Sequence, residues 1–133
     1  MGDEIVALCH DAFPDFDACY LLDRLPHIAD PVLVEARRAN ELVGFKMGYR
    51  RGKSLFYSWL GAVQPDCRRQ GIASRLMAAQ HDWAHGLGFE RIETRTRTSN
   101  TPMIILNLQF GFVITGFETD SAGRGVVTQR KQL

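Results

Sequence analysis

The stretch Gly61–Leu76, GAVQPDCRRQGIASRL, decides the fold of this chain. An apolar segment ends there, a short loop with Pro65 and two arginines follows, and helical spacing begins at Gly71. The start of a helix presents backbone N–H groups without partners and the positive end of the helix dipole. A strand, a loop and a helix joined in this way are therefore typical of an anion-binding site. The Gly-Lys-Ser/Thr of a P-loop and the Gly-x-Gly-x-x-Gly of dinucleotide-binding folds are both absent from it.

Outward from this stretch, hydrophobic periodicity and turn residues predict the remaining elements. Before it we expect helices near residues 5–13 and 15–25, the second capped by Asp15, and strands at 32–38, 41–50 and 54–63. After it we expect a helix at 70–86, with Ile72, Leu76, Ala79 and Trp83 on its inward side, and a strand at 90–98. A largely buried helix at 101–110, capped by Thr101, and a hairpin of strands 112–118 and 125–131 should follow. This order predicts an α/β sheet with helices on both faces.

The composition bounds the class of protein. The chain has 133 residues, 45% of them hydrophobic, which suits one globular domain. No apolar run approaches the ~20 residues of a membrane helix, and the acidic N-terminus is unlike a signal peptide. Three cysteines at unrelated spacings predict neither a disulfide framework nor a metal site. We therefore expect a cytoplasmic protein without a membrane partner. We expect no nucleic-acid partner either, because the basic residues do not cluster with aromatic ones.

The charge is unevenly distributed along the chain. Residues 1–35 hold eight acids and one base, a balance of −7, whereas the remaining residues hold 15 bases and 7 acids, a balance of +8. Such a chain can hold an anion on its basic body and a cation at its acidic end. A solvated helix face explains the acidic end equally well.

The run RRQGIA, Arg68–Ala73, resembles the acyl-CoA-binding motif of the GNAT N-acetyltransferase superfamily, Arg/Gln-x-x-Gly-x-Gly/Ala. Two later landmarks agree with this resemblance: Asn100 opens the next predicted helix, and Gly111-Phe112 closes it. The resemblance covers about residues 31–133. It implies a single GNAT domain over residues 1–133, with a mixed, mostly antiparallel sheet and splayed central strands. Residues 1–30 would form a helical lid on the acceptor side, and residues 31–133 the acyl-CoA-binding body.

The same resemblance implies the function and the site. It implies an acetyl-CoA-dependent N-acetyltransferase that uses no metal and in which a primary amine attacks the thioester directly. One strand would follow the pantetheine arm, the loop and helix start would hold the pyrophosphate, and an asparagine would contact the cofactor across the splay. The residues that match these positions are Gly61, Ala62, Val63, Arg68, Arg69, Gln70, Gly71, Ile72, Ala73, Ser74 and Asn100.

The catalytic residues are left unassigned, because the chain departs from the family pattern. Many relatives have a tyrosine as general acid seven residues after the asparagine, where this chain has Asn107. An amide can donate a hydrogen bond but cannot give up a proton as a general acid does. Other relatives have a catalytic glutamate five residues before the asparagine, and this chain has Arg95 at that position. Glu93 and Tyr57 are the nearby titratable groups. A non-catalytic acyl-CoA-binding module of the same fold is therefore the alternative function.

Other features lead to weaker hypotheses. The −7 charge of the lid suits a cationic amine acceptor. His81 and His85 have the i, i+4 spacing of a two-histidine zinc pair, although no third ligand is apparent and a helix C-terminus also favours histidine. We read Cys67 as a loop cysteine beside two arginines. Sheet edges left by the final hairpin and the short N-terminus would suit a homodimer.

Overall fold

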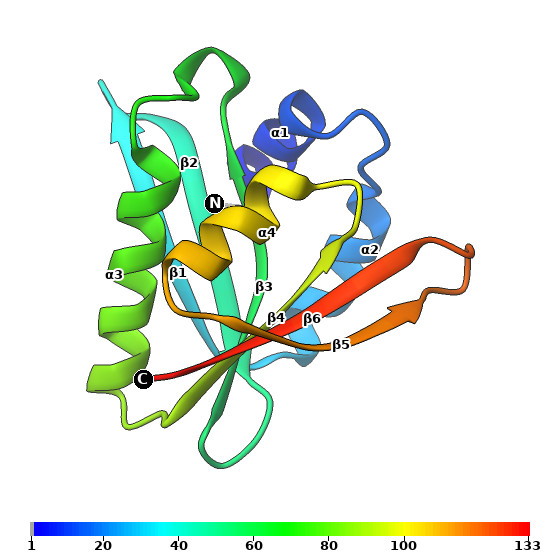
Figure 1. The fold of residues 1–133 in the computed structure, drawn as a ribbon. Helices are drawn as coiled ribbons and strands as arrows, with labels where there is room; N and C mark the ends of the chain where they lie inside the picture. Colours follow the sequence, from blue (N-terminus) through cyan, green and yellow to red (C-terminus); the bar gives the residue numbers. More distant parts are fainter. Residues whose placement is uncertain (1) are drawn as a thin grey trace.

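The structure, a computed structural model, describes residues 2–133 and has the predicted order of elements (Figure 1). Two short 3-10 helices, Leu25–His27 and Pro65–Cys67, complete it. The helices are α1 (Gly2–Ala12), α2 (Ala18–Arg24), α3 (Ile72–Gly86) and α4 (Thr101–Gln109), and the strands are β1 (Ala29–Arg38), β2 (Glu41–Arg50), β3 (Leu55–Val63), β4 (Arg91–Arg97), β5 (Val113–Thr119) and β6 (Gly125–Gln132).

One six-stranded sheet in the order β1-β2-β3-β4-β6-β5 forms the centre of the fold. Four of the neighbouring pairs are antiparallel, and only β3 and β4 are parallel. The predicted turn between β1 and β2 is confirmed, because Ala39 and Asn40 both have positive φ, as a two-residue hairpin turn requires. The parallel pair runs only from Leu55↔Arg91 to Ser58↔Thr94, after which the two strands diverge. The mixed sheet with splayed central strands is thus confirmed.

The helices cover opposite faces of this sheet (Figure 1). On one face, α1 and α2 pack through Ile5, Leu8 and Leu21 against Phe45 and Met47 of β2. On the other face, α3 packs on the sheet beside α4. The residues buried in that second layer are Phe56, Met77, Ala84, Phe89, Ile92 and Phe112.

Two of the predicted helix caps are wrong by one or two residues. Asp17, not Asp15, caps α2, since its Oδ1 accepts hydrogen bonds from the backbone N–H of Cys19 at 2.9 Å and of Tyr20 at 3.4 Å. Asn100, not Thr101, caps α4, because its Oδ1 accepts from the Met103 N–H at 3.4 Å. In both cases the capping oxygen lies one residue before the first helical residue, where it reaches free N–H groups.

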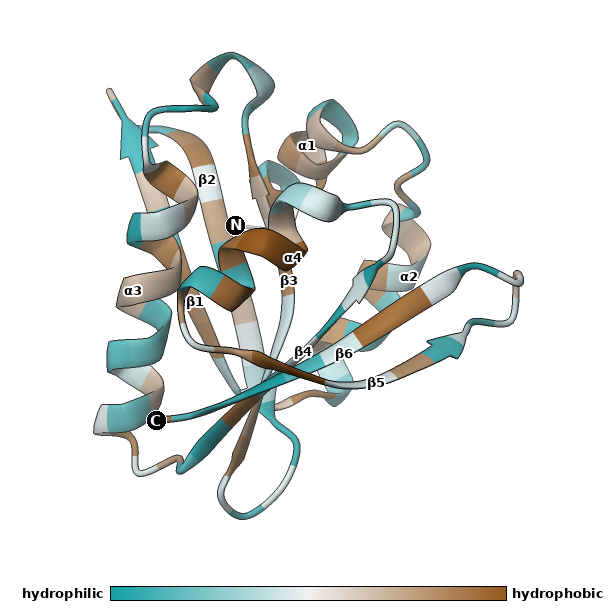
Figure 2. Ribbon diagram, viewed as in Figure 1, coloured by the Kyte–Doolittle hydropathy of each residue, from teal (hydrophilic) through white to brown (hydrophobic). Residues whose placement is uncertain are grey.

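The buried side of two helices also differs from the prediction. Trp83 is 61% exposed, and α3 instead turns Met77, Gln80 and Ala84 inward. Helix α4 is apolar in its middle (Figure 2), yet only Asn107 is buried in it and Ile105 is 48% exposed. An uncharged sequence therefore does not make α4 a core helix, because α4 lies across the sheet surface with one side open.

Candidate active site

The splay between β3 and β4 is the first component of the site. At its vertex, the Thr94 hydroxyl donates to the Ser58 carbonyl oxygen at 3.0 Å. Beyond Ser58, the strand segment Gly61–Val63 pairs only with β2, so its edge toward β4 has no strand partner. Backbone N–H and C=O groups on that edge are free to bond an extended ligand in the manner of an added strand.

A β-bulge shapes the same strand. The register passes from Met47↔Leu60 to Gly48↔Ser58, so Trp59 is an extra residue in β3. A bulge bends its strand and interrupts the ladder of hydrogen bonds. The bend lies directly after the last pair that joins β3 to β4, and the two strands diverge from there.

The N-terminus of α3 is the second component. Gly71 occupies the N-cap position with φ +77°, and no side chain within residues 2–133 caps the helix. A Cβ built on Gly71 meets no described atom within 4 Å, so the space beside this residue is open. The first turn of α3 thus begins beside open space and has no side-chain cap among the described residues, as in an anion-binding helix start.

Arginines surround this helix start. Arg69 also has positive φ, +65°, and Arg68 donates to the Ala12 carbonyl oxygen at 3.4 Å, which ties the loop to α1. Arg75 donates to the Gln70 carbonyl oxygen at 3.4 Å. Two left-handed residues in one short loop turn the chain sharply into α3.

The structure brings most of the sequence-predicted site residues together around these two components. Arg68, Arg69, Gln70 and Gly71 are exposed in the loop, Ala73 and Ser74 are half-buried in the first turn of α3, and Gly61, Ala62 and Val63 end β3. Ile72 differs, because its side chain is buried with Val43, Cys67 and Leu76, so that only its backbone faces the loop. Asn100 begins α4, after the end of β4 on the other side of the splay.

Asn107, at the position of the usual tyrosine, lies inside the protein. It is 2% exposed, and its Nδ2 donates to the Gln129 Oε1 of β6 at 2.9 Å. Gln129 in turn donates to the Ile104 carbonyl oxygen at 3.3 Å. This amide pair fastens α4 to the sheet.

Tyr57 and Glu93 are register partners on the face of the sheet that α2 covers. Glu93 is 8% exposed, and it accepts a hydrogen bond from Arg130 Nε at 2.8 Å. The Arg51 guanidinium lies 3.7 Å from the centre of the Tyr57 ring and 4.0 Å from a Glu93 oxygen. Burial raises the pKa of Tyr57, partly offset by the charges of Arg51 and Arg95. Arg95 itself pairs with Glu118 on β5 and not with Glu93.

Lys46 lies beside the candidate site, opposite Gly61 in the strand register, and sequence reasoning missed it. Gly44, two residues earlier on β2, faces Ile72 and Leu76 of α3, and alternate strand residues share a face, so Lys46 projects under α3. Its Cγ would lie 3.4 Å from a Cβ on Gly61. No hydrogen bond or ion pair joins its ammonium to any residue in the described range. Burial lowers the pKa of Lys46 to about 8. An isolated charge in a strand pattern of apolar residues was the available signal.

His81 and His85 do not form a metal pair. His81 is buried and its Nδ1 lies 3.0 Å from Lys131 Nζ, whereas His85 is exposed. Burial, with the charges of Lys131 and Lys46, lowers the pKa of His81 to about 4. Among residues 2–133, no group of three or more His, Cys, Asp or Glu side chains could hold a metal ion. None of the helices in the same range is long and apolar enough to cross a membrane.

Cys67 is buried within its 3-10 helix and not in an open loop. Burial, followed by a hydrogen bond to Asp66, raises the pKa of its thiol. The neighbouring arginines therefore do not activate Cys67.

Arginines neutralise much of the acidic N-terminal charge. Glu4 and Glu35 both pair with Arg37, and the hydrogen bond from Arg37 lowers the pKa of Glu4. Asp15 lies 3.3 Å from Arg97, whose hydrogen bond lowers the pKa of Asp15. Asp30 pairs with Arg50. The −7 balance is thus largely engaged within the protein, which weakens its value as a signal for a cationic acceptor.

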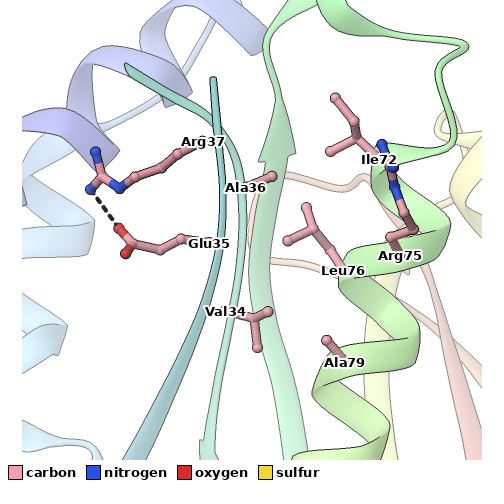
Figure 3. A pocket seen from close by; sticks show the side chains of 8 residues that line it. All are labelled: Val34, Glu35, Ala36, Arg37, Ile72, Arg75, Leu76 and Ala79. Carbon is pink, nitrogen blue, oxygen red and sulfur yellow. Dashed lines mark hydrogen bonds and ion pairs between the residues drawn. The ribbon is translucent and has the colours of Figure 1, made fainter. Parts of the chain in front are cut away.

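A separate groove lies between α3 and β1 (Figure 3). Its lining is mainly aliphatic, with Val34 and Ala36 on the strand and Leu76 and Ala79 on the helix. Glu35 and Arg37 pair with each other on the opposite side of the strand. Helix α3 separates this groove from the splay between β3 and β4. The groove is therefore not part of the candidate site.

Comparison with known proteins agrees with this geometry. The model of the Acetyltransferase (GNAT) family matches residues 3–112. The ribosomal-protein-S18-alanine N-acetyltransferase of Escherichia coli superposes with a TM-score of 0.86 at 14% identity, over 98% of this chain and 86% of the other. Ard1 of Thermoplasma volcanium gives 0.83 at 21% identity, over 100% and 93% of the two chains. A GNAT family acetyltransferase of Elizabethkingia anophelis, solved with acetyl-CoA bound, gives 0.77 at 19% identity, over 95% and 88%.

Proposed function

Because this chain belongs to the acetyltransferase (GNAT) family, we propose that it transfers an acetyl group from acetyl-CoA to a primary amine. The observation that carries the proposal is the open α3 N-terminus at Gly71 beside the unpaired edge of β3. A ligand with a pyrophosphate joined to an extended, amide-containing arm matches these two features in order. Acetyl-CoA has that chemistry, and relatives of this fold are solved with it.

In this proposal each part of the site has one task. The first turn of α3 and Arg68 and Arg69 bind the pyrophosphate, Gly61–Val63 bond the pantetheine arm, and Asn100 contacts the cofactor from the α4 side. Gly71 has no side chain and Ala73 only a methyl group, so the phosphates can approach the backbone. The site needs no metal for this reaction.

The transfer itself is a direct displacement. The neutral amine attacks the thioester carbonyl carbon, a C–N bond forms and the C–S bond breaks. The proton that the amine loses passes through solvent to the departing thiolate, so CoA is released as the free thiol. Backbone N–H groups on the free edge of β3 are available to stabilise the oxyanion. Holding the two substrates in attack geometry within the splay contributes the larger part of the rate enhancement.

A second candidate function, a non-catalytic acyl-CoA-binding module, is favoured by one observation. Asn107 is buried against Gln129, so the general acid common in the family has no counterpart at this position. General acid catalysis contributes about 10²–10⁴-fold, so its loss slows an acetyltransferase without abolishing it. A thiolate is also a better leaving group than most, since the pKa of an ordinary thiol is about 8.5.

Two measurements on the same protein separate the candidates. Calorimetry with acetyl-CoA tests binding, and release of free CoA thiol against a panel of primary amines tests turnover. Binding with turnover supports the enzyme, and binding without turnover on a broad panel supports the module. An absence of acetyl-CoA binding would refute both.

The predicted homodimer remains a proposal. Val113, Ile114 and Phe117 on the edge strand β5 are exposed, as is Ile105 on α4. An edge strand with exposed apolar side chains is a surface that proteins usually cover. Sedimentation of the wild type beside a Phe117→Glu variant tests whether a second copy covers this edge.

A further inference from the structure

Two arginines from different elements meet at one phenol oxygen on the α2 face of the sheet. Arg24, at the end of α2, donates to Tyr49 Oη at 3.2 Å, and Arg51, in the turn after β2, donates to the same oxygen at 3.5 Å. Tyr49 is buried, whereas both arginines are exposed. A neutral phenol between two cations leaves their mutual repulsion uncompensated.

The carboxylates nearby do not balance this charge. Within residues 2–133, no carboxylate lies within ion-pair distance of Arg24. Arg51 lies 4.0 Å from Glu93, but Glu93 is already bound by Arg130 at 2.8 Å. The single carboxylate of Glu93 therefore faces both Arg51 and Arg130, and Arg24 has none in the described range. The cluster thus carries excess positive charge.

Aromatic side chains connect this cluster to the splay. Trp59, the bulge residue of β3, donates from Nε1 to the Tyr20 Oη of α2 at 3.3 Å. The Trp59 ring also lies 5.8 Å from the Tyr49 ring, and Tyr49 lies 5.5 Å from Tyr57. The two arginines are thus one side chain away from the point where β3 and β4 diverge, on the face opposite α3 and α4.

We propose that Arg24 and Arg51 bind a carboxylate of the acceptor, so that the acceptor is a primary amine carrying a carboxylate. This inference rests on the proposed acetyltransferase function. Guanidinium groups bind carboxylates through paired, charge-assisted hydrogen bonds, and Tyr49 holds the two groups toward each other before the ligand arrives. The exposed faces of Tyr20 and Trp59 accommodate an apolar or aromatic portion of the same acceptor.

This assignment replaces the cationic acceptor expected from the acidic residues 1–35. Most of those acids are bound to arginines or cap a helix, whereas the surface beside the splay is basic. A cationic group placed between Arg24 and Arg51 would meet like charges and no free acid.

Matched acceptor pairs test the inference by turnover. Phenylalanine against phenylalaninamide, and 4-aminomethylbenzoate against its carboxamide, replace a carboxylate by an amide and span two amine-to-carboxylate distances. Each kcat/KM is expressed per neutral amine, because the amide also lowers the pKa of the neighbouring α-amino group. We expect at least one acid to have a kcat/KM about 10-fold or more above its amide. Arg24→Gln and Arg51→Gln should each remove most of that preference by lowering the activity on the acid alone. Arg38→Gln should leave the preference unchanged, because Arg38 is an exposed residue of β1 that forms no ion pair with any of the described residues.

A binding measurement tests the same point without turnover. The chain has two tryptophans, so a Trp83→Phe variant leaves Trp59 as the only one, and Trp83 is an exposed residue on α3. Titration of Trp59 fluorescence with N-acetylphenylalanine and its amide reports on this surface even if no amine is acetylated. We expect about 10-fold tighter binding of the acid, lost in both arginine variants.

The possible outcomes are distinct. Turnover on amines with equal or greater activity on the amides would overturn the carboxylate site and leave the acetyltransferase function standing. No turnover on any amine would refute the function, and equal Trp59 titrations for acid and amide would then also overturn the site. A preference that survives both arginine substitutions would place the carboxylate elsewhere and overturn the assignment.

Discussion

Replacing Lys46 with methionine should stabilise the protein at neutral pH. Lys46 lies under α3 with no carboxylate of residues 2–133 at ion-pair distance, and burial lowers its pKa from 10.5 to about 8. A difference of this size corresponds to roughly 3 kcal/mol, since each pH unit of difference is about 1.4 kcal/mol. The side chain retains partial exposure, so solvent screening reduces the expected gain to roughly 1–3 kcal/mol. Methionine keeps the length of the stem and carries no charge.

The pH dependence distinguishes this cause from improved packing. Above pH 10.5, Lys46 is neutral in the folded and unfolded chains, and the penalty is absent. As the pH falls, the unfolded chain binds the proton first, so the penalty grows from about pH 10.5 and is complete below about pH 8. Lys46→Met should therefore stabilise the protein at pH 7 and lose this advantage near pH 10.5.

Urea unfolding at the two pH values measures the effect. The control is Lys53→Met, which changes an exposed lysine in the β2–β3 turn and should shift the free energy of unfolding by less than about 0.5 kcal/mol. An equal gain for Lys46→Met at both pH values, or a destabilisation at pH 7, would refute the argument that the charge of Lys46 is buried and unpaired.

Four further predictions follow from particular contacts. Gly71→Ala should weaken acetyl-CoA binding about 10-fold by calorimetry, whereas Gly123→Ala, which carries the same backbone strain at φ +79°, should cost similar stability and leave binding unchanged. The pKa of buried His81 is lowered to about 4, so the unfolded chain binds the proton first as the pH falls. The free energy of unfolding should therefore drop by up to about 3 kcal/mol between pH 6.5 and pH 4, and His81→Gln should flatten this part of a thermal-unfolding pH profile. Asn107→Ala should destabilise the fold by about 1–3 kcal/mol in urea unfolding, since its buried partner amide loses a donor, while kcat of the folded fraction should remain within a few-fold of the wild type. A thiol reagent should label Cys19 rapidly in the native protein and the two buried cysteines only on unfolding, which mass spectrometry after digestion would check.

The order of the elements was predictable, because turn residues and hydrophobic spacing divide this chain clearly. The two-residue turn at Ala39-Asn40 and the glycines that end α3 and α4 mark boundaries that depend on local geometry. Gly88 and Gly111 both have positive φ, and the residue after each bonds back to the last turn of its helix. Local rules of this kind do not depend on the rest of the fold.

Burial and capping were less predictable, because both depend on neighbours distant in sequence. Trp83 matched a helical stripe, but α3 packs on β1–β3 through Met77 and Gln80 instead. Asp15 was predicted to cap α2, but its carboxylate pairs with Arg97, which is distant in sequence, and Asp17 caps the helix instead. In the same way, the sequence could not show that Lys46 has no ion-pair partner in the described part of the chain, or that Arg24 and Arg51 meet at Tyr49.

The short contact between β3 and β4 joins two parts of the sheet, and each part is formed by one continuous segment of the chain. Residues 2–87 contain β1, β2, β3 and α3, and residues 91–133 contain β4, α4, β5 and β6. Four residue pairs, the apolar cluster around Phe56 and Ile92, and polar contacts such as Lys131–His81 and Arg97–Asp15 hold these fragments together. A break in the backbone near Gly88 leaves these contacts available, so two separately expressed pieces have the surfaces they need to reassemble. Acetyl-CoA bound across the splay would then join the pieces, and reassembly would report on cofactor concentration.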